Sequence, residues 1–162
     1  MSDYEVTSTQ KGAIGENYVA QELILQFDGR LYPFKPIADD DGVDLLVLDK
    51  KMGNSLPLQV KMRTKTIKAS PKVVHFEVRK VTFKSDFDGA VLAVLFKPEV
   101  SKLEVDTAWL IPMKKLHGVT SANSEKFVLR PSIGKESKGR YREFRCVDFS
   151  EVTKRVVELL DS

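Results

Sequence analysis

Two short stretches decide the fold: Asp44-Leu45-Leu46-Val47-Leu48 and, beginning fifteen residues after Asp44, Gln59-Val60-Lys61. Both lie in segments with the apolar pattern of β-strands, and Met52-Gly53-Asn54-Ser55 between them predicts a turn. We therefore expect two neighbouring strands, over residues 43–49 and 56–64. They would bring an acid, an amide and an ammonium group into one sheet.

The register of these two strands decides whether the polar groups can meet. Side chains two apart on a strand share a face, so Gln59 and Lys61 point the same way. In a simple hairpin across the Gly-Asn pair of the turn, Asp44 would stand opposite Arg63, roughly 13 Å from Gln59. A shared site thus requires the turn to be displaced toward Lys51, or a bulge or splay in the second strand.

A second acid, Glu16, falls on the apolar side of a helix expected over residues 9–27. A buried carboxylate without a partner is costly, so we expect Glu16 to lie beside a lysine or a metal. Gly12 and Gly15 have no side chains. They would let this end of the helix approach another backbone, or a ligand, closely.

The rest of the chain predicts one domain over residues 1–162, with a mixed sheet and a closing helix. Further strands are expected at residues 30–36, 73–78, 89–96, 106–112, 127–129 and 141–146, and the closing helix at 152–160. Pro33 and Pro36 suit an edge strand. Trp109 and Cys146 are expected in the core, and His75 and His117 at ordinary surface or strand positions.

Bulk properties exclude several classes of protein. The net charge of +3, from 26 basic and 23 acidic residues, is too small to imply nucleic acid by itself. A single cysteine rules out an intramolecular disulfide framework and a cysteine-cluster zinc site, and it fits the cytoplasm. The first twenty residues are polar and no stretch approaches a membrane span, so we expect neither a signal peptide nor a membrane partner.

The residue types of the proposed site are those of phosphodiester hydrolysis. Asp44 and the amide oxygen of Gln59 can offer oxygen ligands to Mg²⁺. Lys61 could orient or deprotonate the attacking water, or neutralise developing charge. Glu16 could bind the metal through water, accept a hydrogen bond from Lys61, or bind a second ion. It could instead be an edge residue paired with a lysine. Because Gln59 is neutral where a glutamate would be charged, metal binding is expected to be weaker unless Glu16 compensates.

The chain resembles the PD-(D/E)XK nuclease superfamily, in branches with Gln-x-Lys found among restriction-like enzymes and a homing endonuclease family. Three runs carry the resemblance: Lys11-Gly12-Ala13-Ile14-Gly15-Glu16, Gly42-Val43-Asp44-Leu45-Leu46-Val47 and Leu58-Gln59-Val60-Lys61. It spans residues 11–64 and extends less specifically through Ala108-Trp109-Leu110-Ile111-Pro112. One departure is Val43, where the family pattern has proline.

The resemblance implies an α/β fold with a restriction-endonuclease-like core, a central mixed β-sheet flanked by helices. It also implies a metal-dependent site of Asp44, Gln59 and Lys61, with Glu16 as the helix carboxylate. The expected cofactor is Mg²⁺, with Mn²⁺ as an alternative, and no organic cofactor is expected.

Two basic segments, residues 61–80 and 135–145, could follow a phosphate backbone or could be ordinary solvated surface. The predicted DNA contacts are Arg63, Lys65, Lys68, Lys72, Lys138, Arg140 and Arg142. We therefore expect a metal-dependent DNA endonuclease, as a homodimer because one small site cuts one strand. The alternatives are a nuclease-fold module that binds DNA or a partner protein without cutting, and a regulatory protein whose strands form an oligomer interface.

Overall fold

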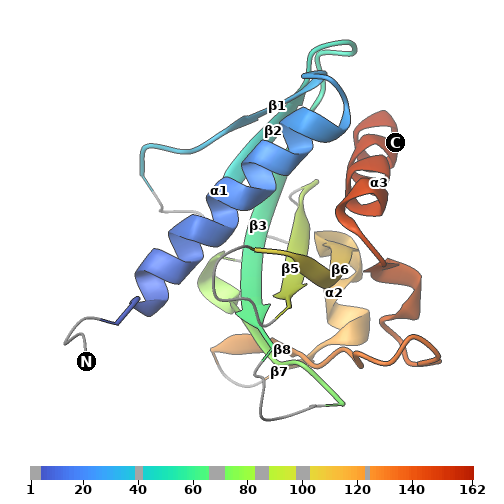
Figure 1. Ribbon diagram of the computed structural model, residues 1–162. Helices are drawn as coiled ribbons and strands as arrows, with labels where there is room; N and C mark the ends of the chain where they lie inside the picture. Colours follow the sequence, from blue (N-terminus) through green and yellow to red (C-terminus); the bar gives the residue numbers. More distant parts are fainter. Residues whose placement is uncertain (1–4, 39–41, 66–71, 83–87, 98–102, 123–124) are drawn as a thin grey trace.

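The computed structural model describes residues 5–38, 42–65, 72–82, 88–97, 103–122 and 125–162. A six-stranded mixed sheet forms its centre (Figure 1). In spatial order its strands are β1 (Leu31–Phe34), β2 (Leu45–Asp49), β3 (Ser55–Thr64), β5 (Ala90–Phe96), β6 (Val105–Pro112) and β9 (Arg145–Cys146). β3 and β5 run parallel, and the other neighbours run antiparallel. The central mixed sheet is the one predicted, and β1 lies at its edge as its proline indicates.

A second sheet of three short strands packs against one face of the first and was not predicted as a separate layer. It consists of β4 (Phe76–Arg79), β8 (Lys126–Leu129) and β7 (Ser121–Ala122), in that order. The 3-10 turn η1 (Lys80–Thr82) follows β4, and the helix α2 (Met113–Val119), also not predicted, follows β6.

The two faces of the central sheet have different cover. The helices α1 (Ser8–Gln26) and α3 (Phe149–Asp161) pack on one face, where Val19 of α1 and Val156 of α3 meet Val60 and its neighbours. The small sheet and α2 cover the other face, where Phe76 packs with Ala93 and others. β5 is buried along its whole length because both faces are covered.

The prediction of a strand at residues 141–146 was wrong for its first part. Residues 142–144 form the 3-10 turn η2 (Arg142–Phe144), and only the last two residues pair as β9. Tyr141 and Phe144 are both buried. Side chains three apart lie on the same side of a 3-10 turn, which buries both rings without a strand.

Several single-residue predictions are confirmed. Trp109 is 1% exposed, and Cys146 is fully buried. Desolvation raises the pKa of the Cys146 thiol to about 12. Within the described residues, no helix combines the length and apolarity needed to cross a bilayer.

The turn between β2 and β3 sets their register. Leu45 stands opposite Leu58, and Leu48 opposite Ser55. The turn is therefore displaced toward Lys51. This displacement is one of the conditions under which Asp44 and Gln59 can share a site.

Asp49, the last residue of β2, holds this turn. Its fully buried carboxylate accepts two hydrogen bonds from Arg30, at 2.9 and 2.5 Å, and one from the backbone N–H of Lys51 at 2.9 Å. Its backbone N–H donates to the Asn54 carbonyl, and its carbonyl accepts from the N–H of Gly53. The hydrogen bonds from Arg30 are the main reason that the pKa of Asp49 is lowered to about 2.

α1 begins with a capping box, in which the Thr7 side chain accepts from the Gln10 N–H and the Gln10 side chain accepts from the Thr7 N–H. Gly15 faces β3 so closely that a Cβ atom there would overlap the Met62 sulfur, whereas a Cβ at Gly12 would meet nothing within 4 Å. The predicted close approach is thus present at Gly15 and not at Gly12.

Alanine substitutions at these two glycines should therefore have different effects on stability. Gly12→Ala gains only helix propensity, and we expect it to raise the free energy of unfolding by about 1 kcal/mol. Gly15→Ala has the same gain, but its Cβ must displace the flexible Met62 side chain, so it should be less stable than Gly12→Ala by about 1 kcal/mol. Urea unfolding of both variants measures the difference. Equal stabilities would contradict the close contact.

Asp49 makes the stability of the fold depend on pH in the acid range. Its folded pKa of about 2 lies below the ordinary value of 3.8. A lowered carboxylate pKa stabilises the fold fully above the unfolded value, and this stabilisation is lost as the pH falls toward 2. This stabilisation by the Asp49 carboxylate is about 2 kcal/mol at neutral pH.

Asp49→Asn should accordingly lose about 2 kcal/mol or more near pH 7, and its deficit should narrow as the pH falls from about 4 toward 2. Urea unfolding of wild type and variant across this range tests it. Glu104→Gln is the control, because Glu104 forms an exposed ion pair with Lys97, and its effect should stay within about 1 kcal/mol. If the stability lost in Asp49→Asn does not change with pH, Asp49 is not the source of the pH-dependent stability.

Candidate active site

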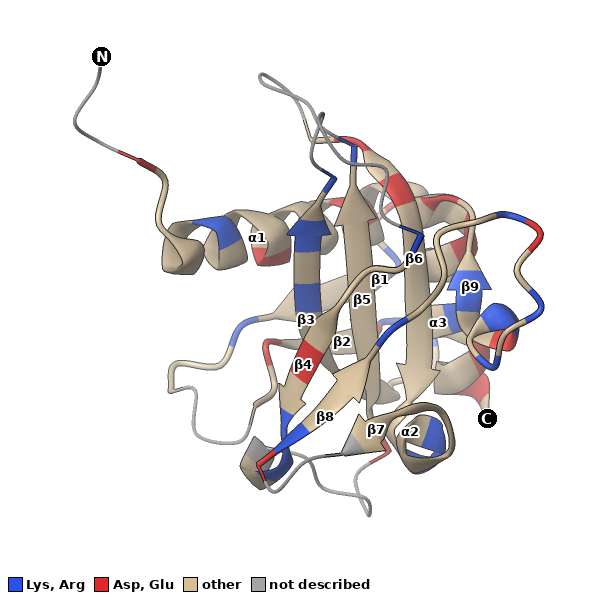
Figure 2. Cartoon of the chain, turned by 90° about the horizontal axis from the view of Figure 1, so that it is seen from below, with Lys and Arg blue, Asp and Glu red and all other residues tan. Residues whose placement is uncertain are grey.

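Asp44, Gln59 and Lys61 line one cavity of about 640 Å³. Arg63 follows them on β3, and residues of the small sheet complete the cavity on the other side. Figure 2 shows the basic positions of β3 lying beside the charged positions of β4. The remaining lining residues are Ser8, Gly42, Phe76, Glu77, Arg79 and Lys126.

Asp44 lies just before β2 and is fastened to β3 by two hydrogen bonds. Its backbone N–H donates to the Leu58 carbonyl at 2.9 Å, and its carboxylate accepts from the Val60 N–H at 2.6 Å. The register that pairs Leu45 with Leu58 brings Asp44 level with Gln59 when it is continued by one residue. The two candidate metal ligands therefore stand side by side, Gln59 on β3 and Asp44 directly before β2.

The polar residues of β3 pass from the protein interior to solvent along one face. Gln59 is 4% exposed, Lys61 is half-buried and Arg63 is exposed. On the parallel neighbour β5, Gln59 pairs with Val91 and Lys61 with Ala93, which are both fully buried. An apolar wall thus stands on one side of the site and raises the strength of electrostatic interactions within it.

Glu16 is the predicted site residue that the structure does not bring into this cavity. Its carboxylate accepts a hydrogen bond from the Lys35 ammonium at 3.0 Å, and its side chain is 28% exposed. α1 packs on the sheet face that carries Met62, whereas Gln59 and Lys61 point to the other face. The pairing with a lysine is one of the alternatives that the sequence left open.

Three charged residues of the cavity were missed as site residues by the sequence reasoning: Glu77, Arg79 and Lys126. Glu77 and Arg79 alternate with buried Phe76 and Val78, so the polar face of this strand is visible in the sequence. What the sequence does not reveal is the partner strand, β8, which pairs with β4 from far along the chain.

The predicted DNA contacts are divided over the surface. Arg63 lines the cavity, and Lys65 pairs with Asp106 at 2.8 Å. Lys72 and Lys138 are exposed, and Lys68 lies outside the described residues. Arg140 and Arg142 line a different cavity, of about 210 Å³, together with Trp109. The structure therefore does not join the second basic segment to the Asp44 cavity.

The donor atoms of the site suit a hard divalent cation. A carboxylate and an amide oxygen are typical ligands of Mg²⁺, which keeps several waters when it binds to proteins. Among the described residues, no three His, Cys, Asp or Glu side chains gather into a metal-binding group. Asp44 and Gln59 would therefore supply the protein ligands, and solvent or phosphate oxygens the others.

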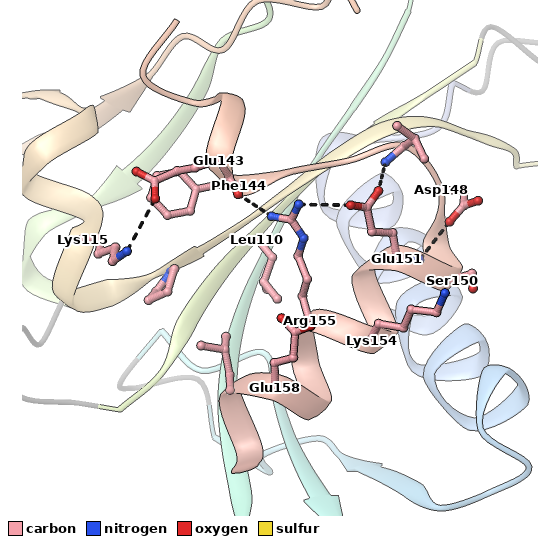
Figure 3. A pocket seen from close by; sticks show the side chains of 13 residues that line it. Leu110, Lys115, Glu143, Phe144, Asp148, Ser150, Glu151, Lys154, Arg155 and Glu158 are labelled. Carbon is pink, nitrogen blue, oxygen red and sulfur yellow. Dashed lines mark hydrogen bonds and ion pairs between the residues drawn. The ribbon is translucent and has the colours of Figure 1, made fainter. Parts of the chain in front are cut away.

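Another cavity, of about 740 Å³, lies beside α3 and differs in character (Figure 3). Arg155 donates to Glu151 at 3.1 Å and to the carbonyl of Glu143 at 2.5 Å, and Lys115 pairs with Glu143 at 3.5 Å. These charged groups bind one another and tie α3 to η2 and α2. The contacts indicate that these residues stabilise the packing of α3 against η2 and α2.

Comparison with solved structures identifies the architecture. The chain is similar to the bacterial homing endonuclease I-Ssp6803I, with a TM-score of 0.59 and 20% identity over 97% of this chain and 96% of that one. The chain has a restriction-endonuclease-like fold. A second similar structure, the Holliday junction resolvase Hjc of Archaeoglobus fulgidus, has a TM-score of 0.42 and 14% identity, over 82% of this chain and 96% of that one. No family model and no curated protein matches the sequence.

The hydrogen bond between Asp44 and Val60 makes Asp44 a structural as well as a site residue. Asp44→Ala leaves the Val60 N–H without this acceptor, so we expect a loss of about 1–3 kcal/mol in the free energy of unfolding. Asp44→Asn keeps an acceptor oxygen and should lose less. Urea unfolding at neutral pH compares them, and equal losses would argue against the bond.

Proposed function

We propose that this protein is a metal-dependent endonuclease that hydrolyses phosphodiester bonds of DNA at the Asp44–Gln59–Lys61 site. The observation that carries the proposal is the β2–β3 register, which sets Asp44 level with Gln59 and beside Lys61 in one cavity. The restriction-endonuclease-like fold supports it, because I-Ssp6803I, which has a similar structure, is a homing endonuclease.

Asp44 and Gln59 would hold Mg²⁺ or Mn²⁺ in this proposal. The bound ion would supply Lewis-acid stabilisation of the charge that develops on the phosphate. Val60 donates to one oxygen of Asp44 and thereby fixes the carboxylate on β3. Burial fixes Gln59 on β3, and the hydrogen bond from Val60 fixes Asp44 beside that strand, so both ligands are preorganised.

Lys61 would act next to the ligands. Its ammonium can donate to the attacking water or to a non-bridging phosphate oxygen, and either contact lowers the barrier by orienting the water or by neutralising charge. Lys61 is half-buried, so water screens its charge less than at a fully exposed position.

Glu16 remains a prediction as a site residue. To take part, its carboxylate would have to break its ion pair with Lys35 and move to the metal site. Cleavage of both DNA strands would need a second copy of the chain, so the homodimer also remains a prediction.

The second candidate is a nuclease-fold module that binds DNA or a partner protein without cutting. The neutral side chain of Gln59 favours it, since Asp44 is then the single acid among the proposed protein ligands. Mn²⁺ titration by calorimetry separates the two candidates. DNA binding without Mn²⁺ binding at millimolar concentration favours the module.

Cleavage assays test the proposed site directly. With Mg²⁺ or Mn²⁺, we expect wild type to cut plasmid or branched DNA. Lys61→Ala should lower the rate by about 100-fold or more, because a positioned charge at the reacting group is removed. Asp44→Asn should lose both Mn²⁺ binding and cleavage.

Lys154→Ala serves as the control, because Lys154 is exposed on α3, on the opposite side of the sheet. Glu16→Gln shows whether the helix carboxylate contributes. If Lys61→Ala cuts as fast as wild type, the proposed site is wrong.

A further inference from the structure

The small sheet contributes its own charged face to the candidate site. Glu77 and Arg79 come from β4, and Lys126 comes from β8. Together with Asp44, Lys61 and Arg63 they make four basic and two acidic side chains around one cavity. The cavity is therefore net positive although it contains the proposed metal ligand, which is the balance expected for a polyanion rather than for a cation alone.

Arg79 and Lys126 stand directly opposite each other in the β4–β8 pair. Like charges at directly opposed positions destabilise an antiparallel pair. The two side chains share one face of the small sheet and line the same cavity. Arginine and lysine are both common phosphate ligands, so this face of the small sheet suits a phosphate group.

Glu77 compensates for this repulsion. Its carboxylate accepts a hydrogen bond from the Lys126 ammonium at 2.6 Å, and its other oxygen lies 3.4 Å from His75. The bond from Lys126 is the main cause of a lowered pKa at Glu77, so the carboxylate stays charged at neutral pH. Lys126 and Glu77 are 36% and 39% exposed, so solvent and ligands reach the pair.

We propose that a backbone phosphate of the nucleic acid binds to Arg79 and Lys126, and that Glu77 is an internal anion which this phosphate displaces from Lys126. The inference rests on the proposed nucleic-acid function but not on cleavage. This phosphate would lie near the scissile one, since Arg79 and Lys126 line the same cavity as Lys61.

Binding measured without a divalent metal tests the inference separately from catalysis. The probe is a fluorescein-labelled DNA duplex, followed by anisotropy in EDTA at rising KCl. Arg79→Gln and Lys126→Gln should each weaken binding roughly five- to tenfold and lower the slope of log K against log[KCl] by about 0.9, because each removes one phosphate contact. Glu77→Gln should tighten binding roughly fivefold, because a competing anion is removed.

Matched variants keep these results interpretable. Lys154→Gln removes one exposed positive charge on the opposite side of the sheet and should bind like wild type. Lys126→Arg keeps the charge and should also bind like wild type. Circular dichroism and thermal unfolding confirm that each variant is folded, and Arg79→Gln decides the outcome if Lys126→Gln does not fold.

Each outcome has a distinct meaning. Unchanged binding by Arg79→Gln and Lys126→Gln overturns the phosphate site, and unchanged or weaker binding by Glu77→Gln overturns the displacement. If wild type binds DNA through Arg79 and Lys126 but does not cut it with Mg²⁺, the proposed hydrolysis fails while this inference stands. If wild type does not bind the duplex, both fail.

Discussion

The ion pair between Arg30 and Asp49 is the interaction on which the candidate site depends. It links the loop before β1 to the end of β2, and the same buried carboxylate caps the backbone of the following turn at Lys51. A turn held at this place fixes which residue of β2 meets which residue of β3. A slip of the register by one residue would turn Asp44 to the other face of the sheet and remove it from Gln59 and Lys61.

The two faces of the central sheet differ: one is fully packed, and the other carries the candidate site. The face under α1 and α3 is a packed core, and Gly15 lets α1 lie close against β3. The opposite face is partly packed under the small sheet and partly open at the cavity. Because alternate residues of β3 belong to alternate faces, Val60 stabilises the core while Gln59 and Lys61 remain available for chemistry.

The sequence predicted what periodicity and local turn chemistry determine. The central strands, both long helices, the burial of Trp109 and the shared face of Gln59 and Lys61 all follow from local patterns. Non-local pairing does not: the sequence shows that Glu77 and Arg79 share a face, but not that β8 lies beside them. The position of Glu16 was ambiguous for the same reason, since its partner, Lys35, lies on a segment whose path depends on tertiary packing.

The pairing of β4 with β8 also has a consequence for the order in which the protein acquires its site. The β2–β3 hairpin joins neighbouring segments, so it can form early, whereas β8 is synthesised long after β4 and closes a large loop when it pairs. A nascent chain therefore carries the acid, the amide and the ammonium before the opposing wall exists. The wall that carries Arg79 and Lys126 is therefore complete only after β8 has been synthesised and has paired with β4.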